Sequence, residues 1–150
     1  MTKFLLAVHV LAAIVAVGPV TVAASMFPPS ARKVLAAPDD LRAREVVRLL
    51  HRICRVYAGV GIAVPVFGIA TASSMGVIGD AWLIVSMGLT VAAAIVLVVL
   101  VLPRQESLLA EGGADRAVTV QLGMFTGVFN LLWATVTVLM IVRPGSTTGA

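Results

Sequence analysis

The feature that most constrains this chain is a basic segment, residues 28–55, placed between two long apolar runs. The apolar runs, residues 4–26 and 56–73, contain no Asp, Glu, Lys or Arg. As a helix, the first run reaches about 34 Å, which is enough to cross a hydrocarbon core of about 30 Å. The segment between the runs holds seven basic residues: Arg32, Lys33, Arg42, Arg44, Arg48, Arg52 and Arg55. Because such segments stay on the cytoplasmic side of a membrane, this one predicts the orientation of every later span.

Two further apolar runs, residues 81–102 and 118–142, bring the number of predicted spans to four. Only 12% of the residues are charged and 60% are hydrophobic, whereas soluble domains carry about 25% charged residues. That charge is too little to cover a surface that faces water. We therefore expect an all-α protein with a single transmembrane domain, an integral membrane four-helix bundle with an interfacial amphipathic helix before the second span.

The distribution of basic residues predicts that both termini lie outside the cell. Nine of the eleven Lys and Arg residues fall in residues 28–55 and 104–116, the two segments that this orientation places in the cytoplasm. Only Lys3 and Arg143 fall on the other side. The high content of Ala, Val and Arg is typical of a GC-rich bacterial genome, so we expect a multi-pass protein of a bacterial plasma membrane.

Prolines mark the expected interruptions, because proline lacks a backbone N–H and its ring clashes with the preceding helical turn. Pro19 is expected to bend the first span, and the sequence Phe27-Pro28-Pro29 is expected to end it. The second span, with Pro65 and several glycines, is expected to be kinked. Pro103 is expected to stop the third span, and residues 143–150 are predicted to be a disordered tail.

Residues 39–55 have the pattern of an amphipathic helix capped by Asp39 or Asp40. A basic stripe recurs at helical spacing and predicts a contact with anionic lipid head groups. The alternative is a solvated flank that only sets the orientation. The stripe consists of Arg44, Arg48, His51 or Arg52, and Arg55, and the apolar side of Leu41, Val46, Val47, Leu49, Leu50 and Ile53.

The fourth span contains a small-xxx-small pattern, Gly123 to Gly127, followed by the polar Asn130. Small residues let helices approach closely in a membrane. The amide of Asn130 needs a polar partner in lipid, so we expect a hydrogen bond to another helix, with a ligand contact as the alternative. The three residues serve packing either within one chain or between two copies, so a homo-oligomer or a partner in a membrane complex is one expectation.

The sequence argues against several classes of function. It has no phosphate-binding Gly-Lys loop, no HExxH motif and no Ser/His/Asp set within the spans, so an ordinary hydrolase or kinase is not indicated. A small transporter is a third alternative, and the absence of a charged residue deep in a span counts against it. The basic residues lie beside apolar spans, so nucleic acid is not the expected partner. We expect a non-enzymatic accessory or scaffolding component of the membrane.

His9 is the one candidate ligand for a cofactor. It lies on the small-residue face of the first span, which is expected to pack into the bundle. Met87 is expected at a matching depth, as are Met75 and Met140, and a His with thioethers suits haem b or copper(I). His51 is expected about 25 Å away along the bundle axis and therefore cannot join His9 within one chain. The other interpretations are a hydrogen bond from His9 to a neighbouring helix and a pairing of His9 between two chains.

The stretch HVLAAIVAVGPVTVAASMFP, with His9 near its start and a basic segment after it, resembles a family of four-span bacterial membrane proteins. That family is similar in layout to the CopD-like group, which includes copper-resistance D-type proteins and HemJ-type protoporphyrinogen oxidases. The resemblance covers the four-span layout and the first span with its histidine. It implies that His9 is associated with haem b, so the alternative function is a haem b- or copper-binding membrane redox protein.

Overall fold

The structure, a computed structural model, describes residues 1–110 and 116–145, and every regular element within those two ranges is a helix. Four helical segments are long and apolar enough to cross a membrane. The prediction of an all-α four-helix bundle is therefore confirmed, and the chain is a helical membrane protein. The four spans are Thr2–Ala36, Leu41–Met75, Ala81–Leu109 and Arg116–Val142.

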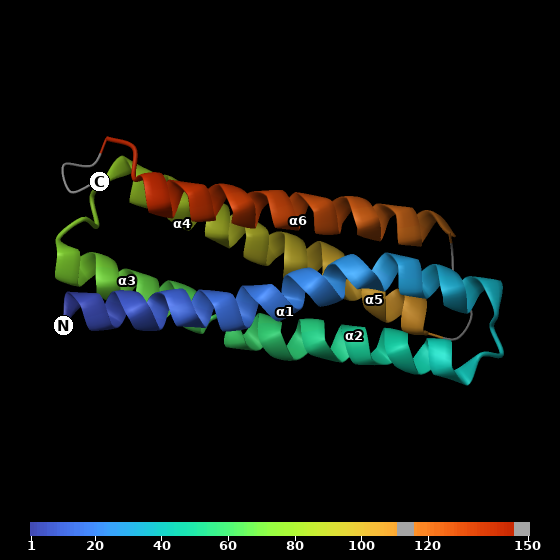
Figure 1. Cartoon of the computed structure of the whole chain (residues 1–150). Coiled ribbons are helices and arrows are strands. Elements are labelled where there is room, and N and C mark those ends of the chain that lie inside the picture. The colour runs from blue at the N-terminus through green and yellow to red at the C-terminus, as the bar shows by residue number, and fades with distance from the viewer. Residues whose placement is uncertain (111–115, 146–150) are drawn as a thin grey trace.

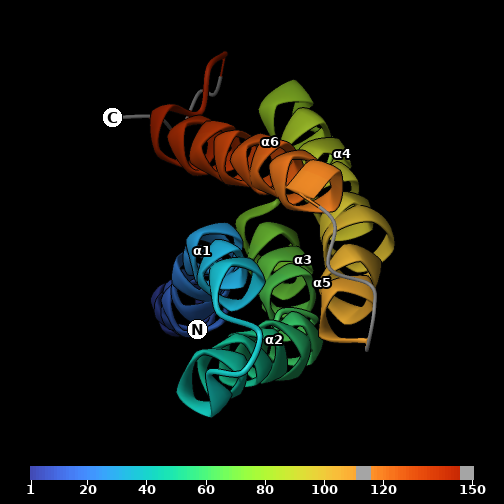
Figure 2. The ribbon, with the colours of Figure 1, turned by 90° about the vertical axis from the view of Figure 1, so that its right-hand side faces the viewer.

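Two spans are single α-helices, the second span is interrupted by a turn, and the third changes to π-helical hydrogen bonding partway along without a break. The first span is the helix α1 (Thr2–Ala36) and the fourth is the helix α6 (Arg116–Val142). The helix α1 packs along both halves of the second span (Figures 1 and 2). The helix α6 packs along the third span and crosses α1. In chain order the elements are α1 (Thr2–Ala36), α2 (Leu41–Val60), α3 (Ala63–Met75), α4 (Ala81–Ile95), the π-helical segment η1 (Val96–Val101), α5 (Leu102–Leu109) and α6 (Arg116–Val142).

The bundle has two distinct ends. One end holds the start of α1, the link from α3 to α4 and the end of α6, and we call it the terminal end (Figure 1). The other end holds the turn from α1 to α2 and the end of α5, and we call it the arginine end because the arginines of α2 begin there. Residues 143–145 of the predicted tail follow α6 at the terminal end, and residues 146–150 lie outside the described residues.

The expectation that Phe27-Pro28-Pro29 ends the first helix is wrong. The helix α1 continues through Pro28 and Pro29 to Ala36. Pro28 is buried, and its Cγ lies 4.0 Å from the position that a Cβ would take at Gly123 of α6. Neighbouring helices can hold a helix together at a proline in this way, because their packing compensates for the lost backbone hydrogen bond. The result is a first helix that extends past the basic residues Arg32 and Lys33.

The expected interruption of the second span is confirmed, and it lies at Gly61–Ile62, between α2 and α3. Pro65 explains the position, because a proline ring clashes with the carbonyl group four residues earlier, here that of Gly61. The turn is closed by hydrogen bonds from the Ile62 N–H to the Gly59 carbonyl and from the Val64 N–H to the Gly61 carbonyl. The two helices α2 and α3 therefore follow one another along α1.

The expectation that Pro103 stops the third helix is also wrong. The helix changes to π-helical hydrogen bonding over Val96–Val101, where the Leu102 N–H donates to the carbonyl of Leu97 five residues earlier. The wider turn accommodates Pro103 without a break. The Arg104 guanidinium donates to the Leu100 carbonyl at 3.0 Å, which satisfies an acceptor near the proline. As a consequence the span continues as α5 and carries Gln105 into the bundle.

The helix α2 is amphipathic as predicted, and Asp40 caps it by accepting hydrogen bonds from the N–H groups of Arg42 and Ala43. The sequence left His51 or Arg52 as the member of the basic stripe, and the structure places His51 on the buried face and Arg52 on the exposed one. That face packs on α1 and α5. The buried residues are Val47, Leu50, His51 and Cys54, whereas Leu41, Val46 and Leu49 of the expected apolar side are exposed.

The core is divided into two unequal clusters. The larger one centres on Phe27, Leu122 and Val101, which are fully buried, and it extends toward the arginine end. The smaller one lies at the terminal end around Trp82, whose indole N–H donates to Asp80 at 3.0 Å. Trp82 therefore lies at an end of its span, as predicted, but its ring is buried in protein. The space between the two clusters is where the candidate site lies.

Candidate ligand-binding cavity

A cavity of about 840 Å³ lies toward the terminal end between two pairs of helices, α1 with α3 and α4 with α6. The two pairs diverge toward this end of the bundle (Figure 1). The lining is mostly aliphatic, with two tryptophans and three methionines. The hydroxyl groups of its threonines are already used, because Thr71, Thr90 and Thr137 each donate to a carbonyl of their own helix. The cavity is therefore apolar apart from a few identifiable groups.

The cavity ends where α1 and α6 cross. The Asn130 amide donates to the Ser25 hydroxyl at 3.1 Å, so the predicted hydrogen bond from Asn130 to another helix is present. Gly123 lies seven residues before Asn130, about two turns further from the cavity, beside Pro28. Gly127 is exposed, and within the described part of the chain no heavy atom of a neighbouring element lies within 4 Å of the position of an added Cβ. Among the described residues, Gly123 is therefore the predicted packing glycine that lies beside another helix, and Gly127 does not.

His9 is one of the residues that line the cavity. Its Nδ1 lies 3.0 Å from the carbonyl oxygen of Val64, and a carbonyl can only accept, so Nδ1 carries the proton. The ring lies against Gly68, where an added Cβ would approach the His9 Cε1 to 3.0 Å. In the neutral imidazole Nε2 is then the nitrogen without a proton, and it has no hydrogen-bond partner among residues 1–110 and 116–145. The predicted hydrogen bond from His9 to a neighbouring helix is confirmed, and it leaves a lone pair available.

The methionines that the sequence placed at the depth of His9 line the same cavity. Met75, Met87 and Met140 come from α3, α4 and α6, so His9 and three thioethers from four helices surround one space. His51 is not among them, since it precedes Val64 by thirteen residues, or about 20 Å of helical rise. Among the described residues there is no group of three or more His, Cys, Asp or Glu that could hold a metal ion.

Arg143 lies at the rim of the cavity and was not selected from the sequence. Of the described lining residues it is the only one with a formal charge. Its guanidinium lies 5.6 Å from the centre of the Trp82 ring, and its Nε donates to the Met140 carbonyl at 3.3 Å. Its backbone has a φ of 47°, which is uncommon for a residue other than glycine. The available signal was a lone arginine directly after an apolar span and before Pro144-Gly145.

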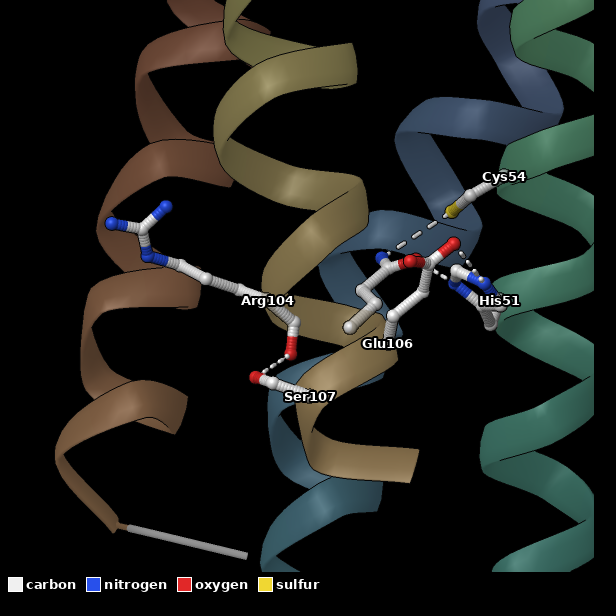
Figure 3. A network of polar contacts seen from close by, with 6 residues as sticks. His51, Cys54, Arg104, Glu106 and Ser107 are labelled. Atoms are coloured by element: carbon white, nitrogen blue, oxygen red, sulfur yellow. Dashed lines mark hydrogen bonds and ion pairs between the residues drawn. The ribbon is translucent and has the colours of Figure 1, made fainter. Parts of the chain in front are cut away.

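A second polar cluster, buried at the arginine end, was also missed (Figure 3). His51 Nδ1 lies 2.9 Å from Gln105 Oε1, and Gln105 Nε2 donates to the Cys54 sulfur at 3.6 Å. Both Gln105 and Cys54 have no exposed surface. His51 Nε2 lies 3.8 Å from a carboxylate oxygen of Glu106, which is largely exposed. Every buried polar atom of this cluster has a partner. The cluster is therefore a set of hydrogen bonds that joins α2 to α5, and we call it the polar tie.

Arg104 points away from that tie toward α6 (Figure 3). Its guanidinium carbon lies 4.4 Å from the centre of the Phe125 ring, and its Nε lies 3.4 Å from Gln121 Oε1. The other predicted site residues are the arginines of α2. Arg48, Arg52 and Arg55 line one groove on the surface of α2, and Arg44 lies outside it.

Comparison with known proteins adds no relative, since no family model, no curated protein and no solved structure matches the chain. The resemblance to the CopD-like group stays a prediction. The functional conclusion therefore depends on the geometry of the cavity itself.

Proposed function

We propose that this protein is a non-enzymatic component of the membrane that holds an apolar or amphipathic molecule in the cavity at the terminal end. The observation that carries the proposal is the cavity, about 840 Å³ of mostly apolar space between two helix pairs. Sites for small molecules in proteins enclose about 300–1,000 Å³ and combine an apolar lining with a few polar groups. Here the polar groups come from two lining residues, His9, whose Nε2 has no partner among the described residues, and Arg143 at the end of α6.

These two groups define the chemistry of the ligand. The Nε2 lone pair accepts a hydrogen bond or binds a metal ion, and the guanidinium favours an anionic or carbonyl oxygen. The ligand is thus a hydrophobic molecule with a hydroxyl group or metal centre in its body and an oxygen-rich group at one end. The apolar walls suit a molecule that enters from the bilayer, because the same lining would exclude a strongly hydrated solute.

The cavity lies in the outer half of a bacterial plasma membrane in this proposal. Its support is the charge distribution, since the arginine end carries nine of the eleven Lys and Arg residues. A reporter fused directly after Arg143 is expected to be exposed outside the cell. A matched reporter inserted after Pro38, in the turn between α1 and α2, is expected to be cytoplasmic. A cytoplasmic signal after Arg143 would reverse the orientation and move the cavity to the inner half.

A second candidate function is a haem b- or copper-binding redox protein, and the His9 hydrogen bond favours it. Histidines that bind metals commonly donate the other ring N–H to a backbone carbonyl, as His9 does to Val64. Met87, Met75 or Met140 would supply a second ligand, and Arg143 would face the carboxylates of a porphyrin. The donor set of one imidazole and several thioethers fits haem iron or copper(I), and either group would supply one-electron chemistry.

The test starts with the full-length protein purified in mild detergent. Solvent extraction and mass spectrometry are expected to detect an apolar molecule in stoichiometric amount, and absorption spectra with copper analysis identify a haem or copper centre. Ala13→Phe fills the cavity and is expected to remove the molecule, whereas Ala94→Phe, on the exposed face of α4, is expected to retain it. A wild-type protein that retains only bulk lipid, with no metal and no colour, would overturn both candidates.

A further inference from the structure

A groove of about 700 Å³ runs along the exposed face of α2 at the arginine end. It is separate from the terminal-end cavity and lies on a different helix. Three arginines, Arg48, Arg52 and Arg55, line it at successive helical turns, so their guanidinium groups project from one face. The remaining lining residues are Glu45, Leu49, His51 and Val56.

The charges of the three arginines are not taken up by ion pairs in the described part of the chain. None of them forms an ion pair or a side-chain hydrogen bond within residues 1–110 and 116–145. Glu45 is the one carboxylate in the lining, so the formal charge of the groove is three minus one, or +2, with His51 neutral. Arginine binds phosphate oxygens in bidentate fashion and is the preferred residue where such groups are recognised. The groove is therefore complementary to an anion with several oxygens.

An apolar strip accompanies the arginines. Leu49 is 56% exposed and Val56 is 55% exposed, and both line the groove. Beyond them, Gly59 and Val60 continue the same face toward α3, and Val60 is also exposed. A free phosphate ion or an acidic peptide would leave this strip uncovered. A phospholipid would cover it, because its acyl chain lies next to its phosphate.

The face that carries the groove is held in a fixed position. His51 lies at its base with only 7% of its surface exposed and is hydrogen bonded to Gln105 of α5. Asp40 caps the start of α2, and the opposite face of the helix packs on α1. A preorganised set of three arginines loses less conformational freedom on binding than three arginines on a mobile segment.

We propose that this groove binds one anionic phospholipid, with its phosphate on Arg48, Arg52 and Arg55 and an acyl chain along Leu49 and Val56. The proposal does not depend on the ligand of the terminal-end cavity. It also separates two roles within the basic stripe. Arg44 lies outside the groove and contributes only to the general positive charge of this end.

The test uses the full-length protein and two triple variants with equal loss of charge. Arg48→Gln, Arg52→Gln and Arg55→Gln remove the groove arginines. Arg32→Gln, Arg42→Gln and Arg44→Gln remove three exposed arginines elsewhere at the arginine end and serve as the control. Binding of dioleoyl-phosphatidylglycerol is measured by native mass spectrometry during titration, with dioleoyl-phosphatidylcholine and inorganic phosphate as comparison ligands.

The wild-type protein and the control variant are expected to bind one phosphatidylglycerol with similar affinity. Each basic residue near an anionic lipid contributes roughly a fivefold effect, so the groove variant is expected to bind about 100-fold more weakly. All six arginines are exposed, and circular dichroism is expected to show unchanged helix content in both variants. Replacement of the groove arginines by lysine is expected to restore only part of the affinity, because lysine cannot bind phosphate in bidentate fashion.

Three results would overturn the proposal. The first is equal weakening in the groove variant and the control variant, which would mean that only total charge matters. The second is equal binding of phosphatidylcholine or of inorganic phosphate, which would mean that the groove does not recognise an anionic lipid. The third is unchanged lipid binding in the groove variant, which would leave the groove free for another partner, such as an acidic protein segment.

Discussion

The helices of this bundle are packed closely at the arginine end and are separated by a cavity at the terminal end. At the arginine end, α2 and α5 are joined through buried polar groups, His51 and Gln105, next to the larger hydrophobic cluster. At the terminal end, α3 and α4 are joined only through a short link and a small cluster around Trp82, and a large cavity separates the helix pairs. Helices in lipid associate through packing and hydrogen bonds rather than through hydrophobic burial. The closed end therefore holds the fold together, and the open end has room for a ligand.

The largest expected effect of a single substitution tests this difference directly. Phe27→Ala removes a fully buried ring from the larger cluster and is expected to cost about 3–5 kcal/mol of unfolding free energy. Leu83→Ala, in the small cluster beside the cavity, is expected to cost about 2 kcal/mol, near the lower limit for such changes. Unfolding in mixed micelles measures both. Equal costs would mean that the terminal end is packed as tightly as the arginine end.

The polar tie at the arginine end gives the next largest effect. Gln105→Leu leaves the His51 N–H without an acceptor in a buried site, which is expected to cost about 1–3 kcal/mol of unfolding free energy. The double variant His51→Leu with Gln105→Leu is expected to recover much of the loss, because two apolar groups of similar shape need no partner. Gln121→Leu, at an exposed position of α6, is the control and is expected to change stability by less than about 0.5 kcal/mol.

These residues also show what the sequence could and could not predict. The four spans and the Asp40 cap follow from apolar length and from local hydrogen-bonding chemistry, so they were predictable. The sequence left the stripe position open between His51 and Arg52, because His51 lies four residues after Val47 and one before Arg52. The spacing from Val47 to Cys54 would have favoured the buried face, but Gln105, the partner of His51, lies in residues 104–116, which were predicted to be in the cytoplasm.

The helix breaks and the cavity depend on long-range packing that no local pattern contains. Pro65 interrupts its span whereas Pro28 does not, because Pro28 is packed against another helix. The helical rise predicted that His9 and the three methionines lie at matching depth, and all four residues line the same cavity. The volume between them was not predictable, because it depends on how far the helix pairs diverge beyond the contact of Ser25 with Asn130.

A smaller effect is expected at the open end, where Gly68 lies against His9. Gly68→Ala places a Cβ within 3.0 Å of the His9 Cε1, so the ring must move and its hydrogen bond to Val64 must lengthen. The loss of one such bond is expected to cost about 1 kcal/mol and to lower the amount of molecule retained in the cavity. Gly88→Ala, where an added Cβ meets nothing within 4 Å, is the control and is expected to retain the molecule. Unchanged retention in Gly68→Ala would argue that His9 does not contact the ligand.

The smallest effect is expected at the crossing that separates the two ends. Asn130→Leu removes one hydrogen bond to Ser25, and single hydrogen bonds between membrane helices contribute about 0.6 kcal/mol on average. The Asn130 carbonyl oxygen is buried without a partner in the described part of the chain, so its removal also relieves an unpaired acceptor. The lost hydrogen bond lowers the unfolding free energy and the removal of the unpaired acceptor raises it. The unfolding free energy is therefore expected to change by less than about 0.6 kcal/mol. A measured loss above about 2 kcal/mol would show that the carbonyl oxygen has a partner outside the described residues, since one hydrogen bond to Ser25 cannot account for it.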